Sequence, residues 1–255
     1  MGGDAKMKIM SLRYPEFHDE VVAALSELGN AKLGLAIQQD RGSKLDYLGV
    51  RFPVLRARVK QGFSFTSRPS QEVTDIWDDL WMHSPWGDVL FAALEYYVPI
   101  AQKRPESELW PILRNWTNRV DNWCHADQLS RVYSHLLERD RQVVYPQMVT
   151  WNRSKNLWER RISLVSLVHY SGKNSVFLTP TEVLPLVQNC LTDPEHYVQT
   201  AVGWVLREIA TKYQGEIAAF IEKHAPEFSG TALSRAIEKL PEDVQRRIRS
   251  QRIIL

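Results

Sequence analysis

The segment Trp123-Cys124-His125-Ala126-Asp127 places an indole and a carboxylate four residues apart in the middle of a 255-residue chain. The surrounding pattern is helical, so Trp123 and Asp127 share one face, one helical turn apart. A carboxylate beside an aromatic ring can stabilise a developing cation or position a water molecule as a general base. The ordinary alternative stays open, because Trp is usually a core residue and Asp a solvated one.

Two later residues could complete such a site. Arg161 precedes the apolar run 162–168, where it could hold a phosphate or form an inward-facing ion pair with Asp127. Trp204 lies in the segment 203–208 and suits either the core or an aromatic surface. We predict that the helices carrying these residues line one basic, aromatic groove that holds nucleic acid.

The elements that position these residues are helices almost throughout, and the segment 175–178 is the only candidate strand. Asp193 and Pro194 are expected to open the helix that begins at His196, with Asp193 as its cap. The expected helices cover residues 15–28, 31–39, 54–62, 70–82, 86–102, 106–120, 121–139, 145–152, 157–170, 181–191, 196–213, 215–224 and 230–240, followed by a short one from 242.

Pairs of these helices recur about every 35 to 45 residues, near the period of HEAT and armadillo repeats. We therefore predict an all-α fold, a HEAT/armadillo-like helical-repeat solenoid with a concave basic groove. A plain irregular helical bundle is the alternative. The prediction treats residues 1–255 as a single domain, in which residues 1–12 are poorly ordered or partly a cloning remnant.

Composition is ordinary for a globular protein, with 44% hydrophobic and 24% charged residues. Nine Trp residues are many for this length, and flat aromatic side chains suit a surface that contacts bases or sugars. Two Cys residues make neither a disulfide framework nor a structural zinc site, and no apolar run approaches the roughly 20 residues that span a bilayer. We expect a soluble, cytoplasmic protein.

The net charge of +2 does not by itself indicate a polyanion partner. Evidence for such a partner has to come from local clusters of basic residues. Residues 68–108 carry eight acidic and three basic side chains, whereas residues 144–174 carry five basic and one acidic. This segregation fits a basic groove facing DNA phosphates, although charge runs are often solvated faces.

Common catalytic and metal-binding motifs are missing. His125 follows Cys124, but adjacent helical positions point about 100° apart and no second ligand pair exists. The sequence also lacks a Walker loop, a dinucleotide fingerprint and a Gly-x-Ser-x-Gly elbow. We expect no cofactor and no metal.

Four blocks of the sequence resemble the AlkD-type DNA alkylation repair family, HEAT-like-repeat DNA glycosylases that excise alkylated purines. The blocks keep the family's order and, with a likeness to its terminal repeat at 234–240, extend over most of the chain. They are residues 48–56, 123–127, 157–161 and 199–208.

The resemblance implies a role for each candidate. Trp123 and Trp204 would be the two groove tryptophans, Asp127 the catalytic carboxylate and Arg161 the DNA-contacting arginine. A second aromatic–carboxylate pair, 116 and 121, has a spacing of five, whereas the family's spacing of four matches 123 and 127. The segment 86–88 does not match the family's pattern, which leaves the fit of the N-terminal repeats open.

The activity so implied is excision of cationic 3-alkyladenine or 7-alkylguanine from double-stranded DNA by a monomer without an obligate protein partner. The rivals are a non-catalytic relative that binds damaged or branched DNA and a protein-interaction scaffold. We predict that six basic residues contact DNA, namely Arg51, Arg153, Lys155, Arg160, Lys173 and Arg207.

Overall fold

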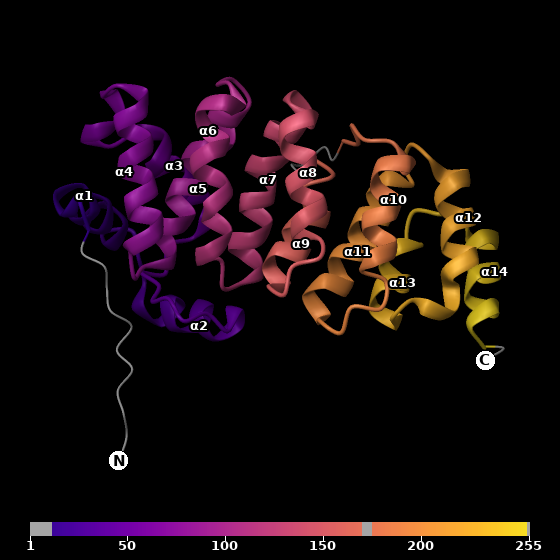
Figure 1. The fold of residues 1–255 in the computed structure, drawn as a ribbon. Helices are drawn as coiled ribbons and strands as arrows, with labels where there is room; N and C mark the ends of the chain where they lie inside the picture. The colour runs from indigo at the N-terminus through magenta and orange to yellow at the C-terminus, as the bar shows by residue number, and fades with distance from the viewer. Residues whose placement is uncertain (1–11, 170–174, 254–255) are drawn as a thin grey trace, which may run out of the picture. The chain divides into compact units, whose positions relative to one another are not determined.

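The computed structural model describes residues 12–169 and 175–253 (Figure 1). Within these ranges the chain forms 14 α-helices and three 3₁₀ helices, and its only β-structure is two isolated bridges, Asp46–Trp86 and His169–Ser175. The all-α prediction is confirmed. The candidate strand at 175–178 was wrong, because only Ser175 forms a bridge. The chain divides into two compact units, residues 1–125 and 126–255, and each is described by itself.

The first unit is built from six helices and the start of a seventh. Two short 3₁₀ helices, η1 (Ser64–Ser67) and η2 (Arg114–Arg119), connect them. The α-helices are α1 (Pro15–Ser26), α2 (Ala31–Arg41), α3 (Phe52–Gln61), α4 (Ser70–His83), α5 (Gly87–Ala101) and α6 (Glu106–Leu113).

Tryptophans dominate the core of this unit. Trp77 and Trp81 of α4 and Trp116 of η2 are fully buried. The rings of Trp81 and Trp116 stack with centroids 4.6 Å apart, and the Trp81 indole donates to the Trp116 carbonyl at 3.1 Å. Offset stacking of this kind adds to the gain from burying large rings. With Trp110 of α6, which is 4% exposed, four of the nine tryptophans therefore serve the core of this unit.

Residues 86–88, which match no family pattern, fasten the loop between α2 and α3. The Asp88 carboxylate accepts backbone N–H groups of Leu48 at 2.7 Å and Val50 at 3.0 Å. Burial raises the pKa of Asp88, and the two backbone hydrogen bonds oppose that shift. Gly87 is required here, because a Cβ would stand 2.3 Å from the Tyr47 ring.

The second unit contains most of α7 (Trp123–Arg139), which begins just before the unit boundary, and the helices that follow it. A 3₁₀ helix, η3 (Ala225–Glu227), lies among them. The remaining helices are α8 (Arg141–Trp151), α9 (Leu157–Val165), α10 (Pro180–Asn189), α11 (His196–Ile209), α12 (Gln214–His224), α13 (Gly230–Ala236) and α14 (Glu242–Ile253).

Helix α11 is the centre of this unit and packs against both α9 and α13 (Figure 1). The close approach to α13 depends on Gly203, since a Cβ there would meet the Ala232 carbonyl oxygen at 2.6 Å and the Arg235 Cβ at 2.9 Å. The residue after this glycine is Trp204, so the contact that Gly203 allows also brings α13 beside a predicted site residue.

Several boundaries differ from expectation for identifiable reasons. Helix α8 begins at Arg141 rather than 145, because the Asp140 side chain caps it by accepting the Val143 N–H at 3.1 Å. Helix α9 ends at Val165, short of the expected 170, and the expected helix 106–120 changes to 3₁₀ geometry at Arg114. Asp193 does not cap α11; the cap position is Glu195.

In the part of the chain that the structure describes, no helix combines the length and apolar character needed to cross a membrane. Residues 1–11, most of the stretch expected to be poorly ordered, lie outside the described residues.

Candidate active site

Asp127 and Arg161 form a two-pronged ion pair inside the second unit. Arg161 Nε donates to one carboxylate oxygen at 2.7 Å and Nη2 donates to the other at 2.9 Å. Both side chains are largely shielded, with 14% of Asp127 and 6% of Arg161 exposed. This fork-to-fork geometry fixes the orientation of the carboxylate as well as its charge. Of the two sequence-level alternatives for Arg161, the structure contains the ion pair.

The rest of the Arg161 guanidinium is held by α11. Its Nη1 donates to the Tyr197 carbonyl at 2.5 Å and to the Thr200 hydroxyl at 2.9 Å. Four of its five N–H groups thus have acceptors: one on Nε, two on Nη1 and one on Nη2. Arg161 therefore acts first as the residue that positions Asp127.

Burial and charge act in opposite directions on Asp127. Burial raises the pKa of this carboxyl, while the charges of Arg161 and Arg235 lower it. The ionised form is the one that the geometry favours, since both oxygens accept N–H groups from a guanidinium. Each carboxylate oxygen keeps lone-pair capacity beyond this bond, so a partly exposed Asp127 can still accept a proton or face a cation.

Trp204 lies on the side of α11 that faces Arg161. The residues at 197, 200 and 204 are spaced three and four apart, which places them on one helix face. Trp204 is half-buried. Asp127 and Arg161 are thus bonded within one unit, and Trp204 lies on the helix face that holds Arg161. The roles of the three residues stay predictions.

The structure adds Arg235, to which the sequence analysis gave no role. Its guanidinium carbon lies 5.8 Å from the centroid of the Trp204 ring, and its charge acts on Asp127. Its buried Nε has no hydrogen-bond partner among the described residues. Its position in the terminal block 234–240 was the signal available, but only the close packing at Gly203 shows where the side chain lies.

Trp123 is the first residue of α7 and is half-buried. The start of the helix is fixed by Asn122, whose side-chain oxygen accepts the N–H groups of Cys124 at 3.0 Å and His125 at 3.1 Å. The fully buried His125 ring bonds the Gly87 carbonyl through Nε2 at 3.0 Å and the Asn122 amide through Nδ1 at 3.0 Å. Both His125 nitrogens are therefore engaged within the protein.

The second aromatic–carboxylate pair, Trp116 and Asp121, has a different setting. Trp116 is fully buried and its indole donates to Asp78 at 2.8 Å. Asp121 accepts the Ser43 hydroxyl at 2.9 and 3.1 Å and the Lys44 N–H at 2.7 Å. These contacts hold a loop in place, so this pair has a structural role and the pair with a spacing of four stays the candidate.

The family model described as DNA alkylation repair enzyme matches residues 21–240. The chain belongs to this family. A comparison with curated protein sequences gives no match. The match extends across both units.

Several solved structures share the fold of this chain. A predicted DNA alkylation repair enzyme from Enterococcus faecalis is 14% identical, with a TM-score of 0.70 over 84% of this chain and 97% of that chain. AlkD2 from Streptococcus mutans is 16% identical, with a TM-score of 0.56 over 83% and 99%.

Alkylpurine DNA glycosylase AlkC from Pseudomonas fluorescens, solved with DNA containing an abasic site analogue, is 14% identical, with a TM-score of 0.51 over 88% of this chain and 61% of that chain. At such identities the likeness shows the fold alone. The predicted helical-repeat fold class is confirmed.

Of the basic residues predicted to contact DNA, some are exposed and others form ion pairs within the protein. Arg51, Arg153 and Lys155 are exposed. Arg160 instead pairs with Asp193 through two contacts, at 2.6 and 3.2 Å, and Arg207 pairs with Glu208 and Glu238. Lys173 lies outside the described residues. DNA contact by these six residues stays a prediction.

Proposed function

We propose that the protein is a DNA glycosylase that excises cationic N-alkylated purines, 3-alkyladenine and 7-alkylguanine, from double-stranded DNA. The observation that carries this proposal is the partly exposed Asp127 carboxylate, held by Arg161 beside Trp204 in a DNA alkylation repair protein. A shielded carboxylate of fixed orientation is the group that an electron-poor sugar requires.

The reaction breaks the bond between C1′ of the deoxyribose and the purine nitrogen, and the bonding electrons leave with the base. Because the alkylated base begins as a cation, it departs neutral and the positive charge moves onto the sugar. Asp127 stabilises that oxocarbenium-like sugar through its negative charge. Water then adds to C1′ and loses a proton, which Asp127 can accept because burial raises its pKa.

The aromatic residues supply the flat surfaces in this scheme. Trp204 packs against the deoxyribose next to the carboxylate, and Trp123, one helical turn before Asp127, offers a second aromatic face. Arg161 keeps the carboxylate ionised and oriented, and Arg235 adds a positive charge beside Trp204. No metal or nucleophilic lysine enters the mechanism. The protein acts as a cytoplasmic monomer, and residues 1–255 form one functional domain.

The decisive experiment measures release of 7-methylguanine and 3-methyladenine from duplex DNA by wild type, Asp127→Asn and Asp121→Asn. Removing the charge of Asp127 is expected to lower excision about a hundredfold or more while DNA binding persists. Asp121→Asn changes the carboxylate of the other aromatic pair and should leave excision by the folded protein within about twofold. Circular dichroism confirms that each variant is folded.

Each alternative has its own outcome in this assay. Unchanged excision by folded Asp127→Asn would remove the catalytic role of that residue. Binding of damaged DNA without any base release by wild type would favour the non-catalytic relative. Failure of wild type to bind DNA at any salt concentration would favour a protein-interaction scaffold.

Exposed basic residues provide the phosphate contacts in this proposal. Arg153 and Lys155 lie two residues apart, and both are exposed. Changing both to Gln is expected to weaken binding of all DNA sequences alike and to reduce the slope of log K against log salt by about two. Arg56→Gln, which removes one charge at an exposed arginine paired with Glu95, is a control for charge loss elsewhere on the surface. An unchanged salt slope in the double variant would exclude these two residues from the interface.

A further inference from the structure

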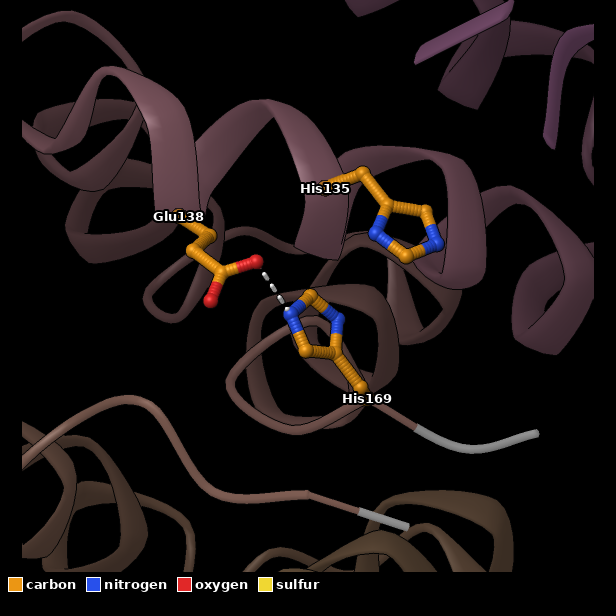
Figure 2. A group of neighbouring side chains, drawn as sticks. All are labelled: His135, Glu138 and His169. Atoms are coloured by element: carbon orange, nitrogen blue, oxygen red, sulfur yellow. Dashed lines mark hydrogen bonds and ion pairs between the residues drawn. The ribbon is translucent and has the colours of Figure 1, made fainter. Parts of the chain in front are cut away.

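A cluster of metal-ligating side chains lies in the second unit and shares no residue with the candidate active site. The ligating atoms of His135, Glu138 and His169 all lie within 4.8 Å of one another. Figure 2 shows the His135 and Glu138 side chains reaching from α7 toward the His169 ring. Two imidazoles and one carboxylate form a donor set that binds transition metals in proteins.

The backbone already places the three donors together. His135 and Glu138 are three residues apart on α7, which puts them on one helix face. His169 lies beyond the end of α9 and exchanges two backbone hydrogen bonds with Ser175, each 3.0 Å long. The third donor is therefore anchored on both of its backbone polar groups.

Stacking fixes the plane of the His169 ring. The centroid of His135 lies 4.6 Å away and that of Phe177 4.5 Å away, with interplanar angles of 26° and 30°. His169 is buried, whereas the Glu138 side chain is 51% exposed. Solvent therefore reaches the cluster through the carboxylate, and a flexible exposed side chain can move the short distance that closes a coordination shell.

Both nitrogens of the His169 ring have partners. Nδ1 lies 2.9 Å from the Ser134 hydroxyl oxygen, and Nε2 lies 2.8 Å from a Glu138 oxygen. A metal ion would replace the hydrogen bond between Nε2 and Glu138 and leave the contact of Nδ1 with Ser134 in place. Such a contact at the other ring nitrogen is what orients a ligating histidine.

His135 supplies the second nitrogen from the same helix face as Glu138. Because its ring stacks on that of His169 at an interplanar angle of 26°, ion binding turns the His135 ring until its nitrogen points at the ion.

We propose that His135, Glu138 and His169 bind one divalent transition-metal ion, with Zn²⁺ the best match to the donors. Mg²⁺ and Ca²⁺ prefer all-oxygen sites and are excluded by the two imidazoles. Three protein ligands leave the fourth position to water or an exogenous anion. The ion joins α7 to the chain segment that follows α9, and it stabilises the second unit independently of glycosylase chemistry.

The test uses the full-length, tag-free protein freed of metal by chelation. Zn²⁺ is titrated by calorimetry and Co²⁺ by visible absorption, with Mg²⁺ as the comparison ion. We expect one Zn²⁺ per chain, four-coordinate Co²⁺ bands, and a Tm higher by about 5–10 °C when Zn²⁺ is a hundredfold above its Kd. Mg²⁺ should give no heat and no shift in Tm.

Three variants and a matched control decide the assignment. His135→Ala and Glu138→Gln should each weaken Zn²⁺ binding about a hundredfold, and Ser134→Ala about tenfold. His224→Gln disrupts a comparable pair, in which His224 Nδ1 bonds Glu227 at 2.6 Å three residues away, and should keep full binding.

Absence of Zn²⁺ binding by wild type, or unchanged affinity in folded His135→Ala and Glu138→Gln, would overturn the proposal. Equal loss in His224→Gln would also overturn it. Because the readouts are affinity, spectrum and Tm, the result is independent of whether the protein excises bases.

Discussion

The chain contains two Trp–Asp pairs close together in sequence, and they have different surroundings. Trp116 is fully buried, and Asp121 accepts hydrogen bonds from a hydroxyl and a backbone N–H of the α2–α3 loop. Trp123 is half-buried, and Asp127 accepts hydrogen bonds on both of its oxygens from one guanidinium. Similar residue types therefore serve a loop anchor in one region and a charged, partly exposed site in the other.

The source of the donors separates the two roles. Neutral donors fix a carboxylate within the fold, whereas a guanidinium keeps a shielded carboxylate ionised and oriented. A partly exposed, ionised Asp127 is available for chemistry, while the oxygens of Asp121 are committed to a loop. Four experiments probe this contrast, from the largest expected effect to the smallest.

Removing one hydrogen-bond donor from each carboxylate, Arg161 from Asp127 and Ser43 from Asp121, should lower the unfolding free energy by unequal amounts. Arg161→Gln leaves Asp127 shielded without its charge partner, so the unfolding free energy should fall by about 3–5 kcal/mol. Ser43→Ala removes a neutral hydrogen bond to Asp121 and should cost about 1 kcal/mol. Urea unfolding at pH 7 measures both, and equal losses would contradict the distinction.

Lowering the pH should reduce the unfolding free energy, because His125, in the region around Asp121, is neutral in the folded protein. Burial, followed by the charge of Arg41, lowers the pKa of His125 to about 4 from a usual 6.5. The unfolded chain therefore binds a proton at a higher pH than the folded one, so stability is complete above pH 6.5 and falls as pH drops toward 4.

The loss attributable to His125 should be about 2 kcal/mol between pH 7 and pH 5, and about 3 kcal/mol at pH 4. Urea unfolding of wild type and His125→Gln at each pH isolates this contribution, because the variant lacks the titrating ring. Parallel pH profiles for the two proteins would contradict the expectation.

Trp204 should matter mainly for excision, and Trp116 mainly for stability. Trp204→Ala removes a partly exposed aromatic surface beside Asp127 and should reduce excision about 10- to 100-fold, with a smaller change in stability. Trp116→Phe breaks the hydrogen bond to Asp78 and the stack on Trp81, so it should cost about 1–3 kcal/mol of stability while excision per folded molecule is unchanged. Excision kinetics and thermal unfolding of both variants test the separation.

Arg235 should contribute least. Its charge acts on Asp127 from beside Trp204, so Arg235→Gln is expected to lower excision about three- to fivefold, with most of the effect on DNA affinity. Arg235→Lys retains the charge and should recover part of the loss. An effect as large as that of Asp127→Asn would give Arg235 a more direct part in the chemistry.

Much of this arrangement could be predicted from local sequence. Helical periodicity indicated the all-α fold, and four blocks in order indicated the family. The same blocks named Asp127, Arg161 and Trp204 as candidates, whose roles stay predictions. Capping was harder to predict, because Asp193 accepts the Glu195 N–H but the cap position is Glu195, and Asp193 also bonds Arg160. A salt bridge to a distant helix is invisible to a local pattern.

The contacts that the sequence did not reveal depend on packing between distant segments. Arg235 reaches the site only because α13 lies against Gly203, and His169 is 31 residues from Glu138, with which it bonds. Metal motifs are recognised by short, regular spacings, and a ligand that follows another helix has none. The same limit applied to the rival pair, since only the three-dimensional partners of Asp121 show its structural role.

Gly203 has a consequence for the tolerance of the chain to mutation. Any side chain at this position would push against the Ala232 carbonyl, and the helix behind it carries Arg235. In a saturation mutagenesis screen scored by survival of an alkylating agent, position 203 should therefore be as intolerant as an active-site position, although a glycine has no side chain to offer DNA. The essential property of this residue is the space that it leaves empty.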